Sequence, residues 1–171
     1  MTTDSAAERG AGARWLTAEQ RLAWLDMVRV FTKLRTTLDA QLERDAGLDF
    51  FEYHVLSMLS ELPGRALRMS KLAQLTSSSL SRLSNVVKRL EAGGLLRREP
   101  DPDDGRASRA VLTAAGMAAV ERASSGHVAL VRELVVDVLD PVQLNQMHAA
   151  HQQILERLDP GGATRPDWID T

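Results

Sequence analysis

Apolar residues recur every three or four positions near the amino-terminal end of the chain, which is the spacing of one face of an α-helix. The stripe begins after Thr17 and Gln20, a pair with capping-box spacing, and ends near Gly47. Its members are Leu22, Leu25, Val28, Phe31, Leu34, Leu38 and Leu42. The pattern predicts one long amphipathic helix.

Two further stripes lie in the last third of the chain. Thr113 can cap a long helix, whose seam steps by three and four through Met117, Val120, Ser124, His127, Val131, Leu134 and Val138. Asp140-Pro141 is a typical helix start, and the stripe that follows is Leu144, Met147, His151, Ile154 and Leu158. Both ends of the chain therefore offer helical faces that can pack together, within one subunit or across two.

The middle of the chain carries shorter segments. A helix that begins at Asp49, with Glu52 as its capping partner, is ended by the Pro-Gly pair at 63–64. The stretch SKLAQLTSSSLSRLSNVVKRLEAGG then predicts a short helix capped by Ser70, a three-residue turn of hydroxyl residues, and a longer helix that ends at Gly93. Two short helices joined by a tight turn form a helix-turn-helix.

A β-hairpin is predicted next, with strands at 95–99 and 107–112 around the turn DPDDGRA. The aspartates of this turn are Asp101, Asp103 and Asp104. All three favour the turn, and the carboxylate of Asp104 can hold the Arg106 guanidinium in a bidentate pair. Whether Asp101 and Asp103 only shape the turn or also repel a polyanion stays open.

Composition narrows the classes of function. The 171 residues, 44% of them hydrophobic, suit one domain, or one domain with a dimerisation extension. The absence of cysteine excludes disulfides, cysteine-zinc sites and thiol redox sensing. There is no apolar run of transmembrane length, and residues 1–14 lack the hydrophobic core of a signal peptide. We therefore expect a cytoplasmic protein with a disordered tail at 1–14.

Charge is unevenly distributed, although the net charge is only −2. Residues 65–109 hold ten Lys and Arg against five Asp and Glu, whereas the rest of the chain holds eleven against eighteen. The basic charge is thus concentrated in the helix-turn-helix and the hairpin, which is typical of a nucleic-acid-binding surface. A solvated basic face is the alternative.

The longer helix of the helix-turn-helix separates into two faces. Its core-facing residues are predicted to be Leu80, Leu83, Val87 and Leu90. The opposite face presents Ser78, Ser81, Arg82, Asn85, Lys88 and Arg89, whose hydroxyl, amide and cationic groups can contact phosphates and base edges. We predict that this face binds DNA, with Arg106 and its neighbour Asp104 at the minor groove and Arg109 at a phosphate.

The hairpin sequence DDGRASRAVLTAAG resembles the D-x-R-x5-L-T-x-x-G signature of the MarR (multiple antibiotic resistance regulator) family. The matching positions are Asp104, Arg106, Leu112, Thr113 and Gly116. The segment that begins SKLAQLTSSS is similar to the helix-turn-helix that precedes this signature. The resemblance covers residues 15–158.

The resemblance implies a mainly α fold. A winged helix-turn-helix domain would occupy 48–112, and a helical dimerisation region would be built from 15–47 and 113–160, with an irregular tail at 161–171. It also implies a homodimer that binds a palindromic DNA operator, usually as a repressor. Many members release DNA when a small aromatic or phenolic effector binds between the two regions.

Aromatic residues near the junction of the first two helices are candidates for an effector pocket, although such residues are more often core. They are Trp24, Phe31, Phe51, Tyr53 and His54. His148 and His151 stand three apart and can bind zinc with a carboxylate, but no dense cluster of ligands surrounds them. We therefore predict no metal and no other cofactor.

An enzyme is not expected, because the sequence has no nucleophile elbow, phosphate loop or paired catalytic carboxylates. The remaining alternative is a winged-helix protein-interaction module, in which the same basic face binds an acidic protein.

Overall fold

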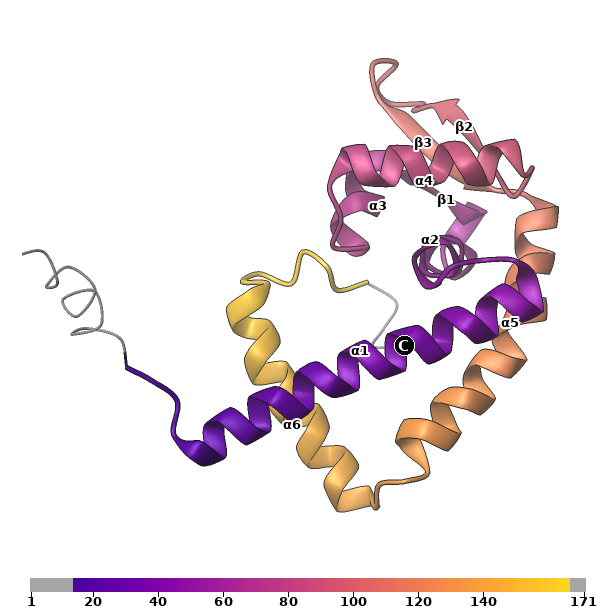
Figure 1. Cartoon of the computed structure of the whole chain (residues 1–171). Coiled ribbons are helices and arrows are strands. Elements are labelled where there is room, and N and C mark those ends of the chain that lie inside the picture. The colour runs from indigo at the N-terminus through magenta and orange to yellow at the C-terminus, as the bar shows by residue number, and fades with distance from the viewer. Residues whose placement is uncertain (1–13, 167–171) are drawn as a thin grey trace, which may run out of the picture. The chain divides into compact units, whose positions relative to one another are not determined.

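The computed structural model describes residues 14–166 (Figure 1). Its elements are α1 (Ala18–Ala46), α2 (Phe50–Ser60), the 3-10 turn η2 (Pro63–Arg65), β1 (Ala66–Arg68), α3 (Met69–Leu75), α4 (Leu80–Ala92), β2 (Leu96–Pro100), β3 (Ser108–Leu112), α5 (Ala114–Val131), the π-helical turn η3 (Arg132–Val136) and α6 (Pro141–Leu158). The chain divides into two compact units at Thr36–Thr37, within α1. The predicted tail at 1–14 lies almost entirely outside the described residues, as do 167–171 of the predicted carboxy-terminal tail.

Most helix starts are the predicted ones, because the cap residues satisfy the free backbone N–H groups of the first turn. In α2, the Glu52 N–H donates to the Asp49 carboxylate (2.8 Å), and the Asp49 N–H donates back to the Glu52 carboxylate (3.2 Å). The same reciprocal bonds join Thr17 to Gln20 and Asp140 to Gln143. The capping boxes predicted at Thr17 and Asp49 are therefore confirmed, and the helix start predicted at Asp140 has a capping box as well.

The start predicted at Ser70 is wrong. Helix α3 begins at Met69, its cap residue is Arg68, and no side chain bonds to its first turn. Arg68 is also the last residue of β1, so the strand runs directly into the helix and leaves Ser70 inside the first turn.

The three strands form one antiparallel sheet in the order β1-β3-β2. The predicted hairpin is confirmed as β2 and β3, with Leu96 opposite Leu112 and Pro100 opposite Ser108. Strand β1 was not predicted, because three residues are too few to show an alternating pattern. Its pairing with β3 makes β3 the central strand.

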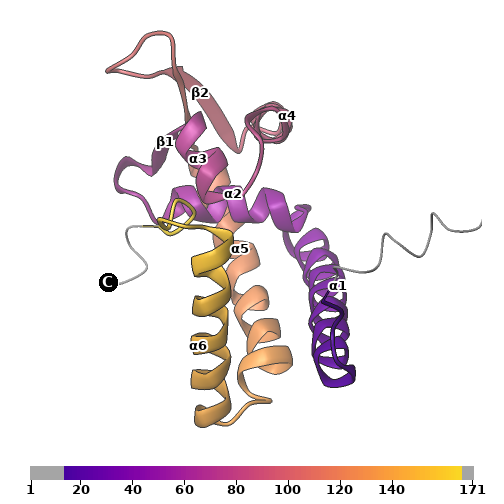
Figure 2. The same ribbon diagram turned by 90° about the vertical axis from the view of Figure 1, so that its left-hand side faces the viewer.

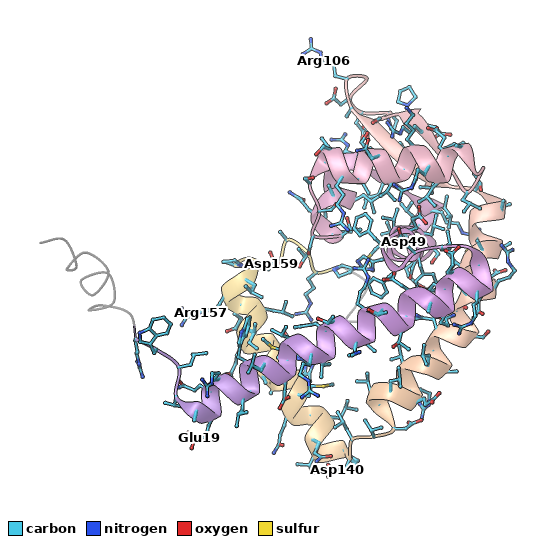
Figure 3. All side chains as sticks on the ribbon, viewed as in Figure 1. Glu19, Asp49, Arg106, Asp140, Arg157 and Asp159 are labelled. Carbon is cyan, nitrogen blue, oxygen red and sulfur yellow. The ribbon has the colours of Figure 1, made fainter. Side chains whose placement is uncertain are left out.

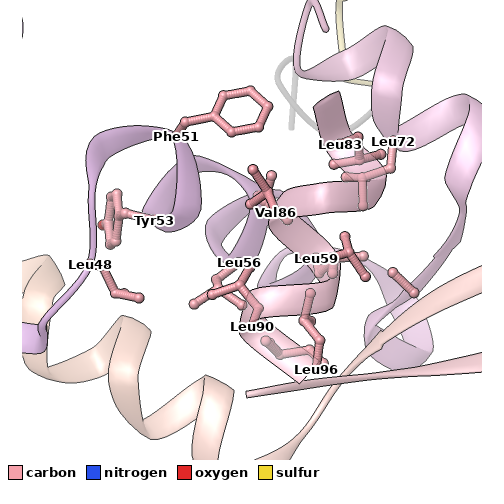
Figure 4. Close-up of a cluster of buried hydrophobic side chains, with 14 of the residues drawn as sticks. Leu48, Phe51, Tyr53, Leu56, Leu59, Leu72, Leu83, Val86, Leu90 and Leu96 are labelled. Atoms are coloured by element: carbon pink, nitrogen blue, oxygen red, sulfur yellow. The ribbon is translucent and has the colours of Figure 1, made fainter. Parts of the chain in front are cut away.

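The core is built from α2, α3, α4, the sheet, the end of α1 and the first half of α5 (Figure 4). Leu42, Leu56, Leu59, Leu72 and Leu83 are among its fully buried side chains. On α4 one prediction is wrong: Leu80 is 54% exposed, and Val86 is buried instead. Leu80 is the first residue of α4, in a turn whose residues, 79–82, are all exposed, so the helix begins beyond the core layer.

The seam predicted through Val138 is interrupted. The α-helical part of α5 ends at Val131, and a π-helical turn follows, in which the Asp137 N–H donates to the Arg132 carbonyl (2.8 Å). The side chains of the same two residues form an ion pair of 2.6 Å. A π-helical turn holds more residues than an α-helical one, so it shifts every later side chain around the helix axis. Val138, the last residue of the predicted seam, is 63% exposed.

Candidate nucleic-acid interface

The helix-turn-helix consists of α3 and α4, and both views place the β2–β3 hairpin beside α4 (Figures 1 and 2). The turn between the helices is held by its own hydroxyl groups. Thr76 donates to the Leu72 carbonyl (2.8 Å), and Ser79 accepts the Arg82 N–H and caps α4. Ser78 was expected on the exposed helix face but lies in this turn, half-buried, with its hydroxyl 3.1 Å from that of Thr76.

Three of the predicted contact residues form an exposed stripe on α4. Ser81, Asn85 and Lys88 lie at helical spacing, and all three are exposed. Within residues 14–166 the side chains of Asn85 and Lys88 form no hydrogen bond or ion pair. The stripe therefore presents a hydroxyl, an amide and an ammonium group to solvent.

The two arginines of α4 lie against α2. The Arg82 guanidinium is 4.5 Å from the centre of the Phe51 ring, a cation–π arrangement. Arg89 donates to the Glu52 carboxylate (2.9 Å) and lies 3.7 Å from Asp49. Asp49 and Glu52 also cap α2, so these contacts join the first turn of α2 to α4.

Arg98 joins strand β2 to α4 by hydrogen bonds. Its guanidinium donates to the Ser84 carbonyl (2.7 Å), and its backbone N–H donates to the Glu91 carboxylate (2.8 Å). Glu91 is the one acidic residue of α4, and it holds the hairpin against the helix.

Asp101 is buried, although the sequence places it among the aspartates of the hairpin turn. Its side chain accepts two hydrogen bonds of 2.7 Å from Arg68 on β1, and the residue is only 6% exposed. It also accepts the Asp103 N–H (3.0 Å). These hydrogen bonds, those from Arg68 above all, hold the pKa of the Asp101 carboxyl below its ordinary value of 3.8. Asp101 therefore ties the base of the hairpin to β1.

Arg106 stands at the tip of the hairpin and points away from the body of the chain (Figure 3). The expected bidentate pair with Asp104 is wrong, because the Asp104 carboxylate accepts the backbone N–H of Arg106 instead (3.0 Å). In the described part of the chain the Arg106 guanidinium has no ion-pair partner. Arg109 is half-buried on β3, opposite Glu99, and its Nε has no hydrogen-bond partner there.

The pH dependence of stability tests the Asp101 contact. Because the pKa of Asp101 is lower in the folded chain, its stabilisation is complete above pH 3.8 and is lost as the pH falls through the folded pKa. Asp101→Asn is expected to lower the melting temperature at neutral pH, and the difference from wild type should shrink below pH 3.8. Asp103→Asn is the control, because the Asp103 side chain is 84% exposed. An equal fall in melting temperature in the two variants would contradict a stabilising contact between Asp101 and Arg68.

The proposed effector residues are only partly brought together. Phe51 and Tyr53 are buried in the core, and Tyr53 lies 4.8 Å from the His127 ring on α5. His54 stacks with Phe50 at 6.2 Å. Burial lowers the pKa of His54 and of His127, and the buried Nδ1 of His127 lacks a hydrogen-bond partner within the described residues.

Trp24 and Phe31 are exposed and belong to the amino-terminal unit. The sequence prediction of a pocket missed Phe50 and His127, whose closeness to Tyr53 and His54 follows from the packing of α2 on α5.

A cavity of about 490 Å³ lies elsewhere, along α6 and the turn that follows it. Its walls include His148, Gln152 and Thr164, but none of the proposed effector residues. His151 is exposed and does not line it. Among residues 14–166, no group of three or more His, Asp or Glu side chains is arranged to hold a metal ion.

None of the described helices is both long enough and apolar enough to cross a membrane.

Comparison with known proteins places the chain in a family. The model of the MarR family matches residues 46–107, which include α2, the helix-turn-helix, β2 and the turn that follows it. A similar protein is the HTH-type transcriptional repressor Rv2887 of Mycobacterium tuberculosis, 32% identical over 132 residues, or 77% of this chain and 86% of that protein.

Two solved structures from Streptomyces coelicolor are also similar. The MarR family transcriptional regulator Sco3205, in complex with DNA, is 42% identical with a TM-score of 0.84, over 87% of this chain and 94% of that one. The MarR family regulator AbsC is 38% identical with a TM-score of 0.82, over 85% and 98% of the two chains. The predicted fold and family are thus confirmed, and the chain belongs to the MarR family of transcriptional regulators, which are not enzymes.

Proposed function

We propose that this protein is a transcriptional repressor that binds a palindromic DNA operator. The observation that carries the proposal is the exposed stripe of Ser81, Asn85 and Lys88 on α4, beside a hairpin whose tip presents Arg106. In the proposed complex α4 enters the major groove and Arg106 the minor groove. The similar regulator Sco3205 was solved in complex with DNA, and the similar Rv2887 is named a repressor.

The bound form is proposed to be a homodimer. Large apolar side chains are exposed at both ends of the chain, including Leu22, Phe31, Val142, Ile154 and Leu158. A single chain rarely leaves so many apolar side chains in water unless another surface covers them. A two-fold dimer presents two copies of α4, about one DNA turn apart, to the two halves of a palindrome.

The domain limits follow from this proposal. Residues 15–47 and 113–160 form the dimerisation region, and 48–112 form the DNA-binding domain. A small aromatic effector is proposed to release the DNA by binding near Tyr53, His54 and His127. The grouped aromatic rings and the unpartnered His127 Nδ1 support this position.

Selection of duplexes from a random DNA library tests the proposal. The selected duplex should contain two inverted half-sites and should bind two protein chains, as measured by light scattering. Asn85→Ala is expected to reduce discrimination between this duplex and one with an altered half-site by about 1–3 kcal/mol, because an asparagine amide can pair with an adenine edge.

Asn145→Ala is the matched control, since Asn145 is an exposed residue of α6, outside the proposed DNA-binding domain. It should leave discrimination unchanged. If no duplex is enriched, the DNA-binding proposal fails, and the alternative of a protein-interaction module gains support. A protein that binds the duplex as a single chain would overturn the dimer alone.

A further inference from the structure

Leu80 is an apolar side chain exposed on an otherwise polar surface. It is the first residue of α4 and is 54% exposed, whereas Leu83 and Leu90 on the same helix are 0% and 3% exposed. Between residues 37 and 127 of the described chain, it is the one large hydrophobic side chain with this degree of exposure. The fold of a single chain therefore does not account for a leucine here.

The proposed dimer contact does not account for Leu80 either. The other exposed large apolar residues belong to α1 and the residues just before it, to the segment from Val128 to Val138, and to α6. Leu80 instead lies in the helix-turn-helix, one residue before Ser81 and five before Asn85. Its immediate surroundings are those of the proposed DNA contact.

The amino-terminal end of a recognition helix is the part that approaches base edges in the major groove. Nearly all groups there are polar, and a leucine placed against them would remove their water without offering a hydrogen bond. The exception is the C5-methyl group of thymine, which is apolar and projects into the major groove. A leucine at the first position of α4 is complementary to that group.

We propose that Leu80 contacts the C5-methyl group of one thymine in each half-site and so contributes to the choice of DNA sequence. The proposal rests on the DNA-binding function argued above. It assigns different roles to the exposed residues in the first two turns of α4. Ser81 and Asn85 form hydrogen bonds with the DNA, whereas Leu80 recognises a methyl group.

Deoxyuridine provides a sharp test, because it differs from thymidine only by the missing methyl group. Each thymine of the library-selected duplex is replaced in turn by deoxyuridine, and binding to the wild-type protein is measured by fluorescence anisotropy. One position in each half-site is expected to lose about fourfold in affinity, the effect of one buried methyl group. Leu80→Ala should bind more weakly and should no longer distinguish thymine from uracil at that position.

Ser81→Ala is the matched control, because it removes a neighbouring polar group and leaves Leu80 in place. This variant should keep the fourfold sensitivity to deoxyuridine. Circular dichroism of Leu80→Ala should match wild type, since the side chain lies outside the core.

Several results would overturn the proposal. The first is a selected duplex whose half-sites contain no thymine. The second is an equal loss of affinity for every deoxyuridine duplex in wild type and Leu80→Ala. The third is a change in the association of the protein chains in Leu80→Ala. Failure to select any duplex would instead overturn the DNA-binding function itself, so the two failures are distinguishable.

Discussion

Gly116→Ala is expected to lower the free energy of unfolding by about 3 kcal/mol or more, because the added methyl group has no space. A Cβ atom at this position would overlap the Leu95 carbonyl oxygen and would lie 2.6 Å from Leu112 Cδ1. The Leu95 carbonyl cannot easily move, since it accepts hydrogen bonds from the Thr113 N–H (3.1 Å) and the Thr113 hydroxyl (3.0 Å). Urea unfolding followed by circular dichroism measures the change.

Gly93→Ala is the control for this substitution. Gly93 has a φ of −79°, and an added Cβ would meet no atom closer than 3.6 Å. The free energy of unfolding of Gly93→Ala should stay within about 1 kcal/mol of wild type. Wild-type stability in Gly116→Ala would show that the first turn of α5 does not approach Leu95 and Leu112 as closely as described.

The same contacts give a physical reason for the T-x-x-G end of the wing signature. Thr113 caps α5 by accepting the Gly116 N–H (3.0 Å), and its hydroxyl is also 2.7 Å from the Gly94 carbonyl. This capping brings the first turn of α5 so close to Leu95 that only glycine fits at position 116. The threonine and the glycine are therefore two parts of one contact.

Leu83→Ala is expected to destabilise the chain by about 2–5 kcal/mol, because it removes a fully buried side chain and leaves a cavity between α4 and the rest of the core. DNA binding should be lost at a lower urea concentration than in wild type, together with the fold. The urea midpoints of wild type and variant, fitted with one common slope of unfolding free energy against urea concentration, give the difference in free energy.

Leu80→Ala makes the same chemical change three residues earlier on the same helix. Because Leu80 is half exposed, its truncation should change stability by only about 0.5 kcal/mol. The reverse ranking would restore the sequence-based prediction that Leu80 belongs to the core. The pair thus separates a residue that holds α4 in place from one proposed to contact DNA.

Features fixed by neighbours in the sequence could be predicted. The capping boxes at Thr17 and Asp49 were recognised because their bonds join residues three apart. The hairpin was recognised from its turn residues. Leu80 was assigned to the core by helical spacing alone, which does not show where the core layer ends.

Features fixed by distant residues could not be predicted. Arg68 and Asp101 are 33 positions apart, and Arg89 and Glu52 are 37 apart. Nothing in the local sequence shows that Asp101 is buried or that Arg89 lies against α2. The sequence therefore indicated which residue types form the candidate interface, whereas the fold shows which of them are already engaged within the protein.

The strand order also bears on how the protein stays dispersed at high concentration. With β3 in the centre, β1 and β2 each keep one edge unpaired within the described sheet, and such edges can recruit strands from other molecules. Strand β1 has only three residues and turns at once into α3. Strand β2 carries the ion pair Arg97–Glu99 (2.6 Å) and ends on Pro100, which lacks a backbone N–H donor. Both edges are thus poor templates for aggregation. The hairpin can therefore stay exposed, as the proposed DNA contact requires, without recruiting strands from other molecules.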